Sequence, residues 1–105
     1  SKDLSKYIVE VTGTPFVPGI VQASHRSALA IFNAVTKAKS TETDAVIQAL
    51  EGLQFDTAAG PYRIRKEDHQ AFLSEFLFDI KNGKHHILEV VPKEKTMFPA
   101  ACKFA

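Results

Sequence analysis

The first apolar positions of the chain recur with the spacing of a helix. In residues 3–12 they fall at every third or fourth position: Leu4, Tyr7, Ile8 and Val11. Side chains with this spacing form one stripe of an amphipathic helix. The run Gly13-Thr14-Pro15 that follows predicts the end of this helix and the start of a connector.

Residues 20–38 show the longest helical pattern of the chain. Five alanines make the segment a strong helix former with a thin surface. One face of the predicted helix carries Ile20, Ser24, Ser27, Ile31 and Val35. A wide apolar surface with several small residues predicts close packing against a sheet or a second helix.

A third helix is predicted over residues 40–53. Thr41 and Asp44 have the spacing of a capping box, in which each side chain satisfies a free backbone N–H at the helix start. Gly52 is suited to the left-handed conformation that closes a helix.

The chain then changes to an extended pattern. Residues 55–59 lead to the turn dipeptide Gly60-Pro61, and residues 62–65 alternate apolar and basic side chains, as in a half-exposed strand. Residues 71–91 give the clearest strand pattern, interrupted by Asn82-Gly83, the strongest short-range indication of a β-hairpin. Pro92 ends the second strand, and the remaining residues are interpreted as a tail.

The predicted hairpin carries apolar residues on both faces, and one of the faces is only half apolar. A two-stranded hairpin alone is only marginally stable in water. We therefore expect it to lie on further strands and interpret the chain as a piece of a larger sheet protein. The order of elements is three helices, an extended segment and a β-hairpin, which is an α/β arrangement.

Composition narrows the function classes. The chain has 105 residues, 45% apolar and 24% charged, with a net charge of +1. These are values of an ordinary soluble globular protein, and they give no indication of binding to nucleic acid or to an anionic membrane. No apolar stretch reaches the roughly 18 residues of a membrane-spanning helix.

The ends of the chain also support the interpretation as a piece. The sequence begins at Ser1 without an initiator Met, and no signal peptide is recognisable. Its one cysteine, Cys102, has no partner for an internal disulfide. The thiol is therefore free, or its partner lies outside this chain.

Two short motifs contain histidine in contexts that resemble chemistry. Asp68-His69 resembles an acid–base pair, but neighbours on a strand point to opposite sides, and no nucleophile motif is present. The competing interpretation is a polar turn in which Asp68 caps a backbone N–H. His85-His86 resembles a metal site, but further ligands are missing at a suitable spacing. We expect no catalytic residue, no metal and no cofactor.

His25 and Arg26, near the start of the long helix, form the remaining candidate. A histidine and a cation close to a helix N-terminus are suited to an anionic ligand such as a carboxylate. The alternative is that both side chains lie on the exposed stripe of the helix.

The ordered series of motifs resembles the C-terminal region of type I periplasmic substrate-binding proteins of ABC transporters, in the branched-chain-amino-acid-like family. The resemblance extends over about residues 16–105 and follows these segments in order: Ala34–Ala38, the Ser-Thr-x-x-Asp run at residues 40–44, Ala49–Gly52, Gly60-Pro61, Asp68–Gln70, the Gly-containing hairpin, and Ala101–Lys103.

This resemblance implies a two-lobed α/β fold with three crossovers and the ligand held between the lobes. Residues 1–70 would belong to one lobe, and residues 71–105 would form late strands, a hairpin and a tail near the hinge or second lobe. His25 takes the position where the family often has an aromatic residue lining the cleft, so it is the one expected ligand-binding residue.

The implied function is that of a non-enzymatic, periplasmic or extracytoplasmic solute-binding protein. It would capture a small ligand, such as an amino acid, amide or small carboxylate, by hinge closure and deliver it to an ABC permease. The remainder of the parent chain or a second copy would be a further partner. Two alternatives remain: an α+β interaction module that self-associates through its hairpin and, ranked last, a small enzyme using His25 or His69.

Overall fold

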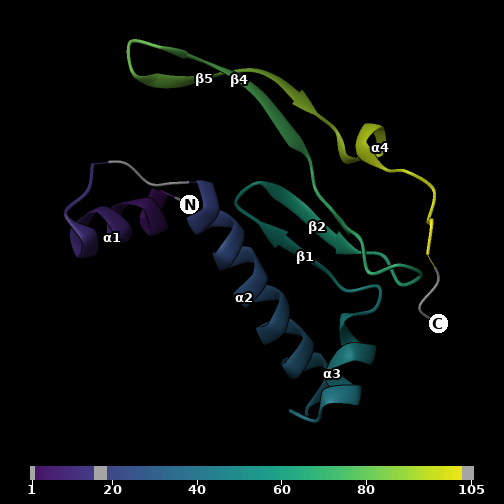
Figure 1. Ribbon diagram of the computed structural model, residues 1–105. Helices are drawn as coiled ribbons and strands as arrows, with labels where there is room; N and C mark the ends of the chain where they lie inside the picture. The colour runs from purple at the N-terminus through teal and green to yellow at the C-terminus, as the bar shows by residue number, and fades with distance from the viewer. Residues whose placement is uncertain (1, 16–18, 103–105) are drawn as a thin grey trace.

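The computed structural model describes residues 2–15, 19–102, with two separate sheets and four helices in this part of the chain (Figure 1). The elements in order are α1 Lys2–Thr12, α2 Gly19–Ala38, α3 Thr43–Leu50, β1 Gln54–Thr57, β2 Gly60–Ile64, β3 Ala71–Phe72, β4 Glu75–Lys81, β5 Lys84–Val91 and α4 Lys93–Thr96. The predicted α/β class, with three helices, an extended segment and a hairpin, is confirmed.

Helix α2 packs through its alanines. Ala34 is completely buried and Ala30 nearly so, whereas Ile20 and Ile31 on the predicted apolar face remain exposed. The prediction of close packing is confirmed, but the predicted face is wrong. Small side chains let α3 and β1 approach the helix backbone, and the bulkier residues face outward.

The main core lies where α2, α3 and β1 meet. Ala34, Ala49 and Leu53 form its buried centre, and Val46 and Phe55 are among the residues packed around it. Among the described residues, no large side chain is less than 2% exposed. The core is therefore thin, and each of its members carries a large share of the stability.

Helix α3 starts differently from the prediction. Its N-cap is Glu42, with no side-chain cap, so the predicted capping box of Thr41 and Asp44 is wrong. The Ser40 hydroxyl accepts a hydrogen bond from the Glu42 N–H at 3.0 Å instead. Gly52 does close the helix as predicted, with φ of +72°.

The extended segment forms a sheet that the sequence pattern did not reveal. β1 and β2 pair antiparallel, with Thr57 opposite Gly60, and β3 adds to β2 through Arg63–Phe72 and Ile64–Ala71. Gly60 is the first residue of β2 and directly follows the two-residue turn at 58–59. Its φ of +104° is a backbone conformation that glycine adopts without steric cost.

The predicted hairpin at Asn82-Gly83 is confirmed, since both residues have positive φ, 52° and 72°. It forms a separate two-stranded sheet, β4–β5, which extends away from the three-stranded sheet (Figure 1). The predicted strand over residues 71–81 is divided at residues 73–74 into β3 and β4. The predicted tail also contains helix α4.

One face of β4–β5 is apolar and exposed. Cross-strand partners share a face, which places Phe76 beside Val90, Phe78 beside Ile87, and Ile80 beside His85. The five apolar side chains are 39–66% exposed. The opposite face is mostly charged. A bulge between Leu77 and Phe78 leaves Leu88 as the extra residue of β5.

Candidate functional site

The most highly connected polar group of the described chain lies at the corner between β2 and β3. Residues 66–68 form a turn, and the Arg65 N–H donates to the Gln70 carbonyl oxygen at 2.8 Å, which closes the corner. The Asp68 carboxylate accepts a hydrogen bond from the Gln70 N–H at 3.2 Å. The prediction that Asp68 caps a local backbone N–H is confirmed. The argument from strand geometry does not apply, because the pair lies outside any strand.

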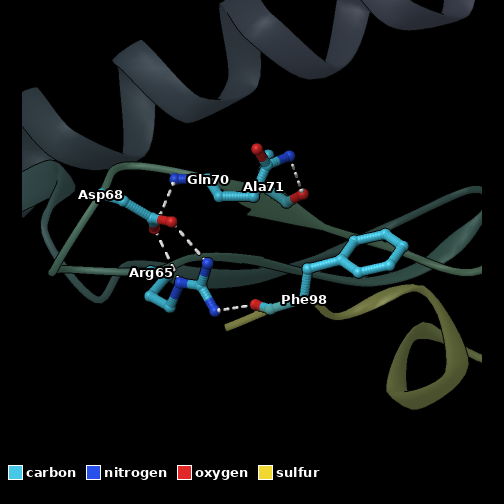
Figure 2. Close-up of polar contacts among 5 residues, drawn as sticks. All are labelled: Arg65, Asp68, Gln70, Ala71 and Phe98. Carbon is cyan, nitrogen blue, oxygen red and sulfur yellow. Dashed lines mark hydrogen bonds and ion pairs between the residues drawn. The ribbon is translucent and has the colours of Figure 1, made fainter. Parts of the chain in front are cut away.

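Arg65 is the centre of this corner (Figure 2). Its Nε donates to Asp68 Oδ1 at 2.7 Å, its Nη2 is ion-paired with Asp68 Oδ2, and its Nη1 donates to the Phe98 carbonyl oxygen at 2.7 Å. The guanidinium also lies over the Phe72 ring, 4.8 Å from its centroid. Three kinds of partner thus fix one side chain: a carboxylate, a backbone carbonyl and an aromatic face.

The pair Arg65–Asp68 is partly shielded from water, with side chains 15% and 13% exposed. The hydrogen bond from Arg65 is the main reason why the pKa of Asp68 is lowered, and the Gln70 N–H lowers it further, while desolvation opposes both. The same hydrogen bond raises the pKa of Arg65. Both groups are therefore held in their charged forms.

This shift predicts a pH-dependent contribution to stability. A carboxyl group whose pKa is lower in the folded state stabilises the fold above its unfolded pKa of about 4, and this contribution is lost as pH falls through the folded pKa. Asp68→Asn is therefore expected to reduce the melting temperature at about pH 7, and this difference from wild type should shrink below about pH 4.

Thermal melts over this pH range test the prediction, with Glu67→Gln as the control. Glu67 lies in the same turn and is exposed, and it acts on Arg65 only through the longer-range Coulomb interaction. Equal pH profiles for the two variants would contradict a specific role for Asp68.

An apolar cavity of about 290 Å³ lies close to this corner, lined by Ile47, Leu50, Ile64 and His69. At its edge, Glu51 is 3.3 Å from the Nε2 of His69 and 3.6 Å from the Nζ of Lys66. His69 therefore interacts with Glu51, whereas Asp68 is bound to Arg65. The two neighbours do not form an acid–base pair.

A second cavity, of about 340 Å³, lies beside Arg65 and Phe98. The predicted ligand-binding residue, His25, is exposed on α2 and lines neither of these two cavities. His85 and His86 lie on β5 opposite Ile80 and Asp79, respectively. His85 meets the Phe78 ring edge-on, with centroids 4.8 Å apart.

In residues 2–15 and 19–102, no three His, Cys, Asp or Glu side chains gather as ligands for a metal ion. No helix of the described chain has the length and apolar character needed to span a membrane.

The role of Arg65 does not follow from the sequence pattern. The alternation with Ile64 predicts a side chain on the exposed side of a strand. One signal for the Arg65–Asp68 ion pair is present in the sequence. The two residues are oppositely charged and three positions apart, a spacing that lets their side chains meet across a tight turn. The second partner of Arg65, the Phe98 carbonyl, is 33 residues away and carries no side-chain signature.

Comparisons with known proteins agree with the resemblance described from the motifs. Residues 2–84 match a family model described as periplasmic binding protein. A curated-protein search gives no match. Among solved structures, the chain is similar to an ABC-type branched-chain amino acid transporter from Rhodopseudomonas palustris CGA009, with a TM-score of 0.77 and 29% identity over 97% of this chain. A second ABC transporter structure from Rhodopseudomonas palustris gives a TM-score of 0.62 and 38% identity over 76% of this chain.

The chain spans 29% and 24% of the length of these two proteins, respectively. The family match covers most of the described residues, including α1, α2, α3 and both strands that precede the corner. The structural match extends through the β4–β5 hairpin as well. The chain therefore belongs to the periplasmic binding protein family, with the fold of the ABC-type branched-chain amino acid binding proteins.

Proposed function

We propose that this chain forms part of an extracytoplasmic solute-binding protein that captures a small ligand and delivers it to an ABC permease. The observation that carries the proposal is the family match over residues 2–84. The ligand class is an amino acid, an amide or a small carboxylate. This assignment is supported by the similarity to the solved structure of an ABC-type branched-chain amino acid transporter. The role is binding and release, without a chemical reaction.

The mechanism is hinge closure, in which contacts from two lobes stabilise the closed state around the ligand. In this proposal, residues 1–70 belong to one lobe, and residues 71–105 lie near the hinge or in the second lobe. The separation of β1–β3 from β4–β5 into two sheets supports a division in this region, but it lies at residues 73–74, because β3 at Ala71–Phe72 still pairs with β2.

A chimeric protein tests the proposed function. The parent is the branched-chain amino acid transporter from Rhodopseudomonas palustris CGA009, which aligns with 97% of this chain. Its matching segment would be replaced by this chain. Titration calorimetry with leucine, isoleucine and valine then compares the chimera with the unmodified protein. We expect a dissociation constant within about tenfold of the parent for the parent's preferred amino acid, a difference of about 1.4 kcal/mol. A folded chimera that has lost binding would contradict the proposal.

His25 is the proposed ligand-binding residue of this chain. The proposal is supported by its exposed side chain on the long helix, where an imidazole is accessible to an anionic group. In the chimera, His25→Ala is expected to weaken binding of the amino acid by about 10- to 100-fold, the usual effect of losing a hydrogen bond to a charged group.

The matched control is His86→Ala, which removes another exposed histidine, on β5. The His86 variant should bind like the unmodified chimera. Unchanged affinity in the His25 variant would exclude ligand contact at this position and would leave the family-based function intact.

A second candidate function is favoured by one observation, the exposed apolar face of β4–β5. An exposed apolar sheet face of this kind is typical of a surface that binds another protein surface. In this alternative, the chain is an α+β interaction module that self-associates through its hairpin. Its test is the oligomeric state of the chain alone.

A further inference from the structure

The C-terminal strap, defined as Met97–Cys102, returns the chain from the ribbon β4–β5 to the three-stranded sheet (Figure 1). It follows α4, which makes no extensive contact with another helix or strand of the described chain. The strap therefore reaches the sheet without the support of a packed helix. The contacts within the strap itself must decide how firmly it is held.

Apolar packing contributes little to the attachment of the strap. The Phe98 residue is 76% exposed and Met97 is 40% exposed. A cavity of about 340 Å³ lies at this place, lined by residues of the strap and of the corner, including Phe98, Pro99, Arg65 and Phe72. Loosely packed surfaces gain little from dispersion, and the hydrogen bond at the Phe98 carbonyl is the polar contact that ties the strap to the corner.

The guanidinium of Arg65 is prepared for this carbonyl. Asp68 occupies Nε and Nη2, which leaves Nη1 directed at the Phe98 oxygen at 2.7 Å (Figure 2). The Phe72 ring supports the guanidinium plane from one side. Release of the strap breaks one hydrogen bond and leaves the Arg65–Asp68 pair in place. Asp68 thus keeps the Arg65 guanidinium in position whether or not the Phe98 carbonyl is bound to it.

The topology gives this single bond a mechanical role. The chain leaves the three-stranded sheet at Phe72, forms β4, β5 and α4, and comes back at Phe98. The chain is therefore joined to the sheet covalently through residues 73–74 before the ribbon and through the Arg65 hydrogen bond after it.

We propose that Arg65 is a latch whose hydrogen bond to the Phe98 carbonyl holds the C-terminal strap closed and sets the angle between the ribbon β4–β5 and the three-stranded sheet. Opening the latch lets the strap, α4 and the ribbon move together relative to the sheet. Arg65 is a positioning residue in this device, which does not depend on the identity of any ligand. The latch would exist in this chain even if the proposed solute-binding function were wrong.

Double electron–electron resonance between two labels tests the latch in the chain itself, with the labelled chain diluted into unlabelled chain so that distances between copies do not contribute. One label is attached to the native Cys102 in the strap, and the other to Asp56→Cys on the exposed side of β1. The wild-type background is expected to give one narrow distance distribution. Arg65→Gln should add a population at longer distance and broaden the distribution, because the neutral amide is too short to hold both partners.

Two further variants separate the latch from a general loss of charge or fold. Arg63→Gln removes an exposed arginine from the same strand and should leave the distribution unchanged. Arg65→Lys keeps the charge but has one ammonium in place of a planar fork, so it should not restore the narrow distribution. Circular dichroism establishes that each variant is folded.

The proposal is overturned if folded Arg65→Gln keeps the narrow wild-type distribution, or if Arg63→Gln broadens it equally. If Arg65→Gln does not fold, Asp68→Asn provides the decisive measurement. It removes the group that orients the guanidinium and retains the donor. A partial shift to longer distance supports the latch, and an unchanged distribution contradicts it.

Discussion

Leu53→Ala is expected to lower the free energy of unfolding by about 2–5 kcal/mol, the range for removing a buried leucine side chain. Leu53 is 7% exposed and packs with Ala34 and Ala49 at the centre of the main core. It also joins two elements through its backbone, since its carbonyl oxygen accepts the Ile64 N–H at 2.9 Å. Because the core is thin, few other buried side chains remain to compensate for the loss.

Urea unfolding followed by circular dichroism measures this loss as a shift in the midpoint. The control is Ile31→Ala on α2, whose residue is 49% exposed and should change stability by about 0.5 kcal/mol or less. Small domains are stable by only about 5–15 kcal/mol, so the loss expected for Leu53→Ala is a large fraction of the total stability. Equal effects of the two substitutions would contradict the assignment of the core.

The second large effect concerns the apolar face of β4–β5. Prepared alone, the chain is expected to self-associate, and the double substitution Phe78→Thr and Ile80→Thr should weaken a symmetric dimer by about 10⁴-fold. The estimate follows from about 1.5 kcal/mol for each of four large side chains no longer buried, two from each copy, with about 1.4 kcal/mol for each factor of ten. Both residues are now exposed, at 50% and 66%.

Sedimentation velocity at several concentrations measures this association. Leu77→Thr is the matched control, because Leu77 is 54% exposed but lies on the opposite, mostly charged face. A wild-type chain that remains monomeric at all concentrations would contradict self-association and remove support for the interaction module. It would leave the family assignment unaffected.

The sequence predicted the elements whose patterns are local. The helical spacing of Leu4, Ile8 and Val11 and the turn at Asn82-Gly83 each depend on neighbouring residues, and both were confirmed. The faces were harder to assign. Counting apolar bulk pointed to Ile20 and Ile31, but close approach of helices favours the smallest side chains, so Ala30 and Ala34 are buried instead.

The candidate site was predicted only in part. Asp68 as a cap followed from its short polar side chain and the adjoining turn, and it was confirmed. The β1–β2 pairing was missed because Gly60-Pro61 reads as a turn, whereas both residues belong to β2. The contact between Arg65 and Phe98 depends on where α4 directs the strap, which no residue pattern encodes.

The order in which these contacts form has a consequence for folding. Helix α2 packs on α3, β1 pairs with β2, β2 with β3, and β4 with β5, so these principal pairings join neighbours in the sequence. Such local contacts cost little loop entropy and form rapidly. The bond between Arg65 and Phe98, 33 residues apart, has to wait for the corner and the hairpin. We therefore expect the strap to be the last part of the chain to dock in folding and the first to detach when the chain begins to unfold.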